Sequence, residues 1–263
     1  MQGRLLPKYM GRYQAHPKGN WRDEFDVARA LDVDLIEFIL DYEDAAENPL
    51  LADPDAIAAA VDETGVAVKS ICADYFMEAP MQRDAAGHEV LATLIVNAAR
   101  LGVRDIVIPC VDQSSLSDAS ETAAFVDALA GHARDAAARR INLALETDLA
   151  PGPFAALLER FDGPAVTVNY DSGNSASLGF NPTEEFDAYG HRITDIHLKD
   201  RTRNGGPVVL SEGDCDFDTL FALIASSEFD GPLVMQAFRD DEGVTIFARQ
   251  QAWLRDNYTE ILQ

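Results

Sequence analysis

Short, largely apolar runs alternate with longer amphipathic stretches along the whole chain. The short runs are typical of strands buried on both faces, and the longer stretches are typical of helices that cover a sheet. The pattern predicts eight strands, over Gln2–Leu5, Asp34–Ile39, Val66–Cys72, Asp105–Cys110, Ile141–Glu146, Ala165–Tyr170, Ile193–Lys199 and Pro232–Gln236. It predicts eight helices, over Trp21–Leu31, Pro54–Thr64, Ala85–Leu101, Ser120–Arg139, Pro153–Phe161, Pro182–Tyr189, Phe217–Ser227 and Thr245–Tyr258. This alternation indicates repeated βα units around a parallel sheet.

The predicted helices carry residues that are typical of helix ends. Asp53, Asn181 and Asp216 each precede a helix and offer a side-chain acceptor to its free backbone N–H groups. Gly65 and Gly102 close helices directly before strands. Because no flexible linker divides the series, we expect residues 1–263 to form one α/β domain, a (β/α)8 TIM barrel. The alternative is a doubly wound open sheet, which would need a glycine-rich phosphate-binding turn that the chain lacks.

The composition is that of a globular, acidic protein. The chain has 263 residues, 45 acidic and 21 basic side chains and a formal net charge of −24, which repels polyanions and disfavours a nucleic-acid partner. No apolar run approaches the ~18 residues of a membrane-spanning helix, so no membrane association is expected. The start of the chain lacks the apolar core of a signal peptide, and a cytoplasmic location is therefore expected. The three cysteines share no close spacing and are expected to be reduced.

Four side chains of metal-binding type lie at the ends of the last four predicted strands. Glu146 ends the fifth strand, Asp171 follows the sixth, His197 lies in the seventh and Gln236 ends the eighth. These ends form the catalytic face of a (β/α)8 barrel, where two carboxylates, an imidazole and an amide oxygen suit a divalent metal ion. Carboxylates that follow apolar runs also need a cation or hydrogen bonds to offset their burial. The alternative is that Glu146 and Asp171 only terminate strands and that His197 is a hydrogen-bonded core residue.

Several short motifs, in this order, resemble those of a known family. The chain begins with MQGRL, and later units contain CADYFM, LALETD, VNYDSGNSASLG, IHLKDR and SEGDCDF. Over nearly its whole length the chain resembles the xylose-isomerase-like, or AP-endonuclease-2-like, TIM-barrel superfamily, and within it the sugar-phosphate isomerase/epimerase proteins. The resemblance implies that Glu146, Asp171 and His197 are metal ligands. It also implies that Gln236 occupies the position where ketose 3-epimerases have a second glutamate, which is both a ligand and an acid/base group.

The glutamine changes the expected chemistry. A glutamine carbonyl can coordinate a metal ion, but a primary amide does not transfer protons near neutral pH. Two carboxylates just neutralise a divalent ion (Mn, Mg, Co or Zn), which leaves the ion a stronger Lewis acid than three carboxylates would. We therefore expect an isomerase or epimerase of a sugar or sugar phosphate in which Glu146 moves a proton beside a metal-polarised carbonyl. Epimerisation would need a second acid, such as Asp148 or Glu37.

Two other functions remain open at the level of sequence. A dehydratase acting on a polyol-derived ketone would begin with the same enolisation, and a catalytically degenerate carbohydrate-binding barrel would explain Gln236. Nuclease relatives of this superfamily need a histidine-rich cluster of zinc ions. Only His197 among the five histidines lies at a predicted strand end, which argues against nuclease activity.

Basic residues gather after the last two predicted strands of this acidic chain, where barrel enzymes frequently bind phosphate. They are Lys199, Arg201, Arg203 and Arg239. We expect them to bind an anionic group of the substrate, a sugar or sugar phosphate; the alternative is salt bridges to nearby acids. Glu37 is expected to accept a hydrogen bond from a sugar hydroxyl, and Asn174 either binds such a hydroxyl or caps a turn. A homodimer is the default expectation for the assembly.

Overall fold

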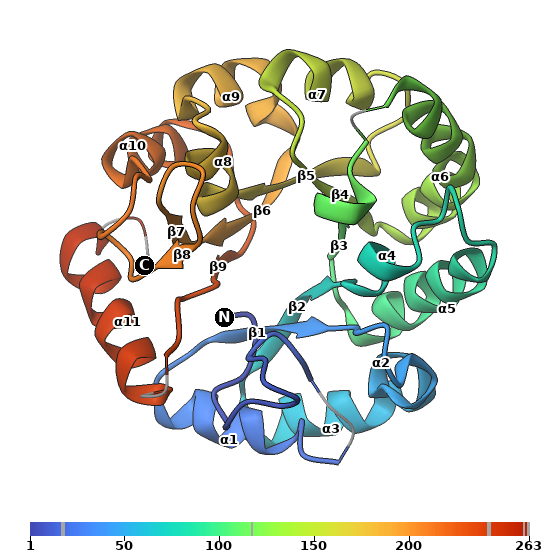
Figure 1. Cartoon of the computed structure of the whole chain (residues 1–263). Helices are drawn as coiled ribbons and strands as arrows, with labels where there is room; N and C mark the ends of the chain where they lie inside the picture. Colours follow the sequence, from blue (N-terminus) through green and yellow to red (C-terminus); the bar gives the residue numbers. More distant parts are fainter. Residues whose placement is uncertain (17–18, 117, 241–242, 260, 262–263) are drawn as a thin grey trace.

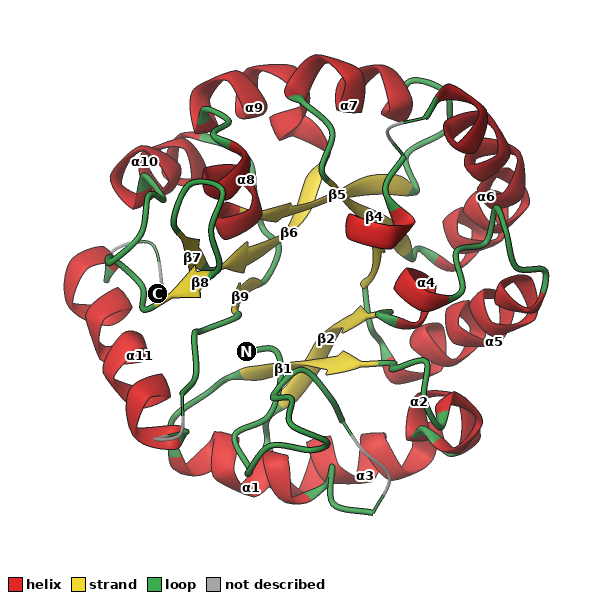
Figure 2. Cartoon of the chain, viewed as in Figure 1, coloured by secondary structure: helices red, strands yellow, loops and turns green. Residues whose placement is uncertain are grey.

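Seven parallel strands form the wall of a barrel, and a ring of helices surrounds them (Figures 1 and 2). The computed structural model describes residues 1–16, 19–116, 118–240, 243–259 and 261. The wall is made, in spatial order, of β1 (Leu35–Ile39), β2 (Ala67–Cys72), β3 (Asp105–Cys110), β4 (Asn142–Thr147), β5 (Val166–Asp171), β6 (Ile193–Leu198) and β9 (Leu233–Met235). A separate antiparallel hairpin follows β6 and consists of β7 (Asp200–Arg201) and β8 (Pro207–Val208). The predicted TIM-barrel fold is confirmed.

All eight predicted helices are present, with ends that differ from the predicted ones by at most three residues. They are α1 (Asp23–Ala30), α3 (Pro54–Thr64), α5 (Ala86–Leu101), α6 (Ala119–Arg139), α7 (Pro151–Leu158), α9 (Pro182–Tyr189), α10 (Phe217–Ser226) and α11 (Val244–Tyr258). Asp53, Asn181 and Asp216 cap their helices as predicted. Within the described residues, no helix has the length and apolar character needed to cross a bilayer.

Shorter helices that the sequence pattern did not predict lie mostly in the loops after strands. They are α2 (Pro49–Ala52), α4 (Tyr75–Glu78) and α8 (Ser172–Leu178), with single 3₁₀ turns at Ala45–Glu47, Asp112–Ser114 and Gly190–Arg192. Helix α8 begins directly after β5 and therefore lies at the catalytic face of the barrel.

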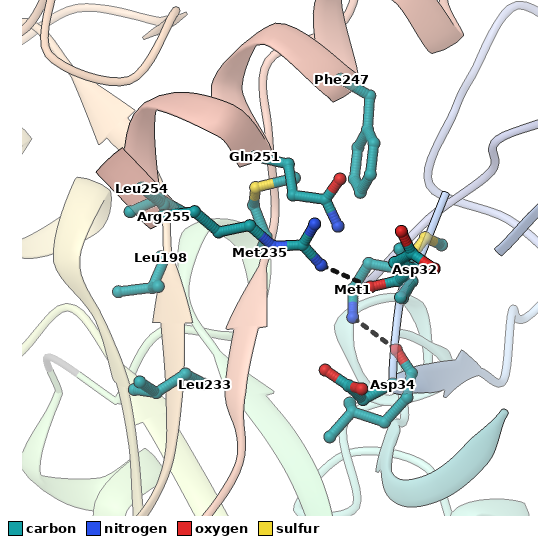
Figure 3. Close-up of a pocket in the computed structure, with 12 residues that line it drawn as sticks. Met1, Asp32, Asp34, Leu198, Leu233, Met235, Phe247, Gln251, Leu254 and Arg255 are labelled. Atoms are coloured by element: carbon teal, nitrogen blue, oxygen red, sulfur yellow. Dashed lines mark hydrogen bonds between the residues drawn. The ribbon is translucent and has the colours of Figure 1, made fainter. Parts of the chain in front are cut away.

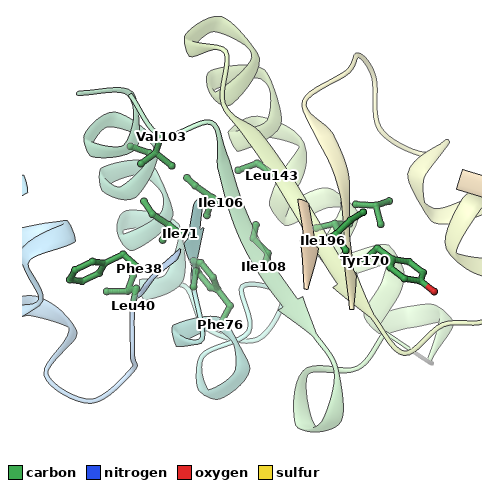
Figure 4. Packing of buried hydrophobic residues seen from close by; sticks show 14 of the residues in the cluster. Phe38, Leu40, Ile71, Phe76, Val103, Ile106, Ile108, Leu143, Tyr170 and Ile196 are labelled. Atoms are coloured by element: carbon green, nitrogen blue, oxygen red, sulfur yellow. The ribbon is translucent and has the colours of Figure 1, made fainter. Parts of the chain in front are cut away.

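The main hydrophobic core lies between the barrel wall and the helices. Phe38, Ile71, Ile106 and Leu143 belong to this layer and are fully buried (Figure 4). Successive residues of a strand point to opposite faces, so the intervening positions face the barrel interior. A small apolar cluster lies in that interior: Ile39, Cys72, Val107 and Ala144. Many other interior positions carry buried polar side chains, which include Glu37, Ser70, Asp105, Asn169, Asp195 and His197.

The prediction of a first strand over Gln2–Leu5 is wrong except at Gln2. The Gln2 N–H donates to the Met235 carbonyl at 3.2 Å, and the Glu37 N–H donates to the Met1 carbonyl at 2.8 Å. A single residue thus bridges β9 and β1. Gly3 then adopts a φ of +83°, a left-handed conformation that ends the extended backbone. We call this narrow junction between β9 and β1 the seam of the barrel. A cavity of about 200 Å³ opens beside the seam, between β9, α11 and the start of β1 (Figure 3).

Candidate metal centre and active site

Three predicted metal ligands meet at the carboxyl ends of three neighbouring strands. Glu146, Asp171 and His197 come from β4, β5 and β6, and one ligand atom from each lies within 4.8 Å of the others. His197 Nδ1 is 3.5 Å from Glu146 Oε2 and 3.9 Å from Asp171 Oδ2. All three side chains are buried. Parallel strands end at the same rim, so residues far apart in sequence converge there.

The orientation of His197 is set by Glu37, on the opposite side of the ring. His197 Nε2 lies 2.8 Å from Glu37 Oε1, and because an ionised carboxylate only accepts, Nε2 carries the proton. Glu37 also accepts from Gln2 Nε2 at 2.9 Å and from Ser70 Oγ at 2.5 Å. Since Glu37 is fully buried and already accepts three hydrogen bonds, the geometry favours a role in orienting His197 over the expected contact with a sugar hydroxyl.

A second cluster of Glu37, Asp195 and His197 shares the same imidazole. A neutral imidazole has a single lone pair, so it can serve one of the two clusters at a time. The contact between His197 Nε2 and Glu37 places the proton on the side of Asp195 and leaves Nδ1 for Glu146 and Asp171. The cluster of Glu146, Asp171 and His197 is therefore the candidate metal centre.

Two amides hold the Glu146 carboxylate from opposite sides. Asn169 Nδ2 donates to Oε2 at 2.9 Å and lies 3.1 Å from His197 Nδ1, and Asn174 Nδ2 donates to Oε1 at 2.7 Å. Asn174 lies in α8, and its backbone N–H donates to Asp171 Oδ1 at 2.8 Å. Asn174 was predicted from the sequence as a site residue, and Asn169 was not. The available signal was its place two residues before Asp171, on the same face of β5.

The two carboxyl groups of the cluster have pKa values that are pushed apart. Burial, together with the nearby charge of Asp171, raises the pKa of Glu146 to about 7. Burial alone would raise the pKa of Asp171, but Lys199 and His197 outweigh it and lower that pKa to about 2. Lys199 Nζ lies 3.5 Å from Asp171 Oδ2. A pair separated in this way has one group that is permanently ionised and one poised to exchange protons near neutral pH.

The donor set fits a divalent metal ion. In the described structure, Asp171 Oδ2 is buried and accepts no hydrogen bond; Lys199 Nζ at 3.5 Å balances its charge, and its lone pairs stay available to a metal ion. The surrounding carboxylates raise the pKa of His197 well above its usual value, although burial opposes them, so a metal ion would displace a proton on binding. Gln236 directly follows β9, and its Oε1 is likewise buried without a hydrogen-bond partner among the described residues.

The predicted anion-binding residues fall into two groups. Lys199 directly precedes the hairpin and lies 3.5 Å from Asp171, Arg201 ends β7, and Arg203 lies between β7 and β8. Arg201 donates to Asn174 Oδ1 at 2.8 Å and, through Nε, to the Gly205 carbonyl at 3.0 Å, so these contacts use neutral acceptors. Its link to Asn174 connects the hairpin to the amide that holds Glu146.

Arg239 lies apart from the hairpin, in the seam of the barrel. Its guanidinium carbon is 5.7 Å from the centre of the Tyr13 ring and 5.0 Å from that of Phe247. Burial lowers the pKa of Arg239 to about 10. The rings and the 3.5 Å contact to the Gln2 carbonyl favour a structural role for this residue over the expected contact with substrate.

Two further acidic residues were missed by the sequence analysis. Glu185, behind α8, accepts from Ser175 Oγ at 2.5 Å, Tyr189 Oη at 2.9 Å and Tyr170 Oη at 3.0 Å. Asp74 follows β2, and burial raises its pKa to about 6. Asp74 is close enough to contribute to the raised pKa of Glu146. Its place after a strand end was a usable signal, whereas the partners of Glu185 depend on long-range packing.

The family assignment follows from comparison with known proteins. A family model described as "Xylose isomerase-like TIM barrel" matches residues 25–257. The chain belongs to this family. The L-ribulose-5-phosphate 3-epimerase UlaE of Salmonella paratyphi C (strain RKS4594) is 26% identical over 268 residues, which cover 94% of this chain and 93% of that relative.

Solved structures of other proteins share the barrel. The 3-keto-D-glucoside 4-epimerase YcjR from E. coli has a TM-score of 0.72 at 18% identity and covers 92% of this chain and 97% of its own. A xylose isomerase-like TIM barrel protein from Mycobacterium smegmatis, crystallised with magnesium, has a TM-score of 0.72 at 18% identity over 94% of this chain and 90% of its own. These likenesses confirm the fold predicted from sequence.

Proposed function

We propose that this protein is a metal-dependent epimerase or isomerase of a sugar phosphate. The observation that carries the proposal is the placement of Glu146, a buried carboxylate that two amides fix beside Asp171 and His197. A carboxylate held in this way is positioned to act as a general base. The relative UlaE, named as an L-ribulose-5-phosphate 3-epimerase, supports the same class of reaction.

Glu146, Asp171, His197 and Gln236 are the residues that would hold a divalent ion of Mn, Mg, Co or Zn. When bound, the ion supplies the positive charge that polarises the substrate carbonyl and acidifies the neighbouring C–H group. Asp171 would contribute a permanent negative charge, and His197 would contribute its Nδ1 lone pair, which lies 3.1 Å from Asn169 Nδ2 in the structure. A protein of the same fold from Mycobacterium smegmatis was solved in complex with magnesium, which agrees with a metal-dependent function.

Glu146 takes the proton from the carbon beside the carbonyl. Asn169 and Asn174 donate to its two oxygens, so they favour the ionised form and fix the direction of the carboxylate. Returning the proton on the same face to the former carbonyl carbon, while the hydroxyl proton passes from the neighbouring oxygen to the former carbonyl oxygen, gives an isomerase. Delivery of a proton to the opposite face of the same carbon gives an epimerase and requires a second acid.

Asp74 is the strongest candidate for the second acid. Glu37 is fully buried against His197, and Gln236 has no titratable proton near neutral pH. Asp74 lies at the end of β2, partly exposed, with a pKa raised by burial to about 6. Asp148 stays a second candidate; it is half-buried and accepts from Ser115 Oγ at 2.8 Å.

Arg201 and Arg203 in the hairpin support an anionic substrate, whereas Lys199 is paired with Asp171. Arg201 makes its contacts to an amide and a carbonyl, so its positive charge remains available to a phosphate. An Arg201→Gln change is expected to raise the KM for a phosphorylated ketose at least about tenfold, since one charge-assisted contact contributes roughly 1.5–3 kcal/mol. The KM for the same ketose without its phosphate should change little.

The function is tested with a panel of ketose 5-phosphates and their free sugars, each assayed with Mn²⁺ and with chelator. Product analysis by NMR separates an inverted centre from a moved carbonyl, and a loss of water would indicate a dehydratase. Metal-dependent turnover of a phosphorylated member is the expected result. Turnover that is unaffected by chelator, or restricted to free sugars, would contradict the proposal.

A further inference from the structure

The seam of the barrel contains a chain of side-chain hydrogen bonds that runs from Gln236 to His197. Gln236 Nε2 donates to Gln2 Oε1, and Gln2 Nε2 donates to Glu37 Oε1 at 2.9 Å. The same Glu37 oxygen lies 2.8 Å from His197 Nε2. Gln2 is 1% exposed, so water does not compete for its amide. Gln2 therefore connects Gln236, a proposed ligand, to Glu37, the residue that orients His197.

The direction of this chain follows from chemistry at its Glu37 end. The Glu37 carboxylate accepts and has no proton to give, so Gln2 must turn its NH₂ group toward it. The Gln2 carbonyl then faces Gln236, which must in turn present its own NH₂ group. As a result, Gln236 Oε1 is left buried and without a hydrogen-bond partner among the described residues. A buried carbonyl oxygen without a partner is costly unless another group satisfies it.

We propose that Gln2 is a positioning residue that fixes the Gln236 amide with its oxygen free to act as a neutral metal ligand. The inference rests on the proposed metal-dependent function and extends it to a residue in the barrel seam. It also explains why a glutamine suits position 236. A glutamate there would face the Gln2 carbonyl with a second acceptor, and reversing the Gln2 amide would set its oxygen against Glu37.

The backbone of Gln2 bridges β9 and β1, and a substitution of its side chain leaves this bridge in place. The bridge between β9 and β1 uses the main-chain groups of residues 1, 2, 37 and 235. Gln2→Met keeps this bridge and the length of the side chain but removes both amide hydrogen bonds. Gln236→Met removes the proposed ligand, and Gln113→Met changes an exposed glutamine on the surface and is the control.

The experiment measures Mn²⁺ affinity of the chelator-stripped protein from the EPR signal of free Mn²⁺. Gln2→Met should weaken binding about 10- to 100-fold, as is typical when a residue that orients a ligand is lost. Gln236→Met should weaken it to a similar extent, and the double variant no further, because Gln2→Met acts by releasing the same Gln236 oxygen that Gln236→Met removes. Gln113→Met should bind as the wild type does.

Three results would overturn the inference. These are wild-type affinity in Gln2→Met, a full additional loss when Gln2→Met is added to Gln236→Met, and a loss of equal size in Gln113→Met. If Gln2→Met does not fold, as judged by circular dichroism, Gln2→Asn replaces it, because an amide shortened by one methylene cannot reach both partners and should show the same loss. A wild-type protein that binds no Mn²⁺ would instead overturn the metal-dependent function itself.

Discussion

His197 and Glu37 lie 160 positions apart in the sequence, yet His197 Nε2 is 2.8 Å from Glu37 Oε1 in the interior of the barrel. Both side chains are fully buried. The contact fixes the tautomer of the imidazole and leaves Nδ1 toward Glu146 and Asp171. A carboxylate behind a histidine ligand is a common device for raising its basicity and holding its ring.

Glu37→Gln tests this contact. An amide at position 37 would present NH₂ to either the Gln2 amide or the Ser70 hydroxyl, both of which now donate to the carboxylate. We expect Mn²⁺ affinity to fall about 10- to 100-fold in a calorimetric titration. Glu212→Gln changes an exposed glutamate and should have no effect. Equal affinities of the two variants would show that Glu37 does not act through His197.

Gln236→Glu separates an adapted site from a degenerate one. If Gln236 is only a lost glutamate, restoring the carboxylate should raise activity. The amide chain through Gln2 predicts the opposite, because two acceptors would face each other in the buried seam. We expect kcat to fall at least about fivefold, which corresponds to roughly 1 kcal/mol in the transition state. A gain in kcat would mean that the present site is degenerate.

Glu185→Ala tests whether Glu185 stabilises the packing behind α8. The change leaves the hydroxyls of Ser175, Tyr189 and Tyr170 without their shared acceptor. Unpaired buried donors cost roughly 1–3 kcal/mol each, so the free energy of unfolding should fall by about 3 kcal/mol or more in a urea titration. Glu184→Ala, at the exposed neighbouring position, should stay within about 0.5 kcal/mol of the wild type. Similar urea midpoints for Glu185→Ala and Glu184→Ala would contradict a stabilising role of Glu185.

Burial of Asp105 predicts how the free energy of unfolding depends on pH. It lies on the floor of the barrel, fully buried, and burial raises its pKa from 3.8 to about 6. The folded protein therefore binds this proton more tightly than the unfolded chain, so stability falls as the pH rises from about 4 to about 6.

Asp105→Asn should remove this pH dependence. Relative to the wild type, the variant should gain up to about 3 kcal/mol of unfolding free energy between pH 4 and pH 7, since one pKa unit corresponds to about 1.4 kcal/mol. Asn142 Nδ2 now donates to Asp105 Oδ1 at 2.8 Å, a bond that an asparagine oxygen can still accept. Asp62→Asn, at an exposed site, is the control and should follow the wild-type curve. Parallel curves for Asp105→Asn and the wild type would contradict the prediction.

The sequence predicted the parts of the molecule that depend on local pattern. Apolar runs predict the strands, and the convergence of parallel strand ends predicts that Glu146, Asp171 and His197 lie together, as they do in the structure. The first strand could not be predicted correctly, because its pairing at Gln2 depends on β9, which lies more than two hundred residues away. The roles of Gln2, Asn169 and Glu185 likewise arise from contacts between distant elements, which a periodic pattern does not encode.

Solvent deuterium incorporation tests the central claim most directly. The protein is incubated in D₂O with Mn²⁺ and a phosphorylated ketose that it turns over, and the recovered sugar is examined by NMR. Deuterium should appear at the carbon beside the carbonyl, and the incorporation should be lost with chelator and fall about 10²- to 10⁴-fold in Glu146→Gln. Product formation without deuterium at that carbon, or undiminished incorporation in Glu146→Gln, would contradict the assignment of Glu146 as the base.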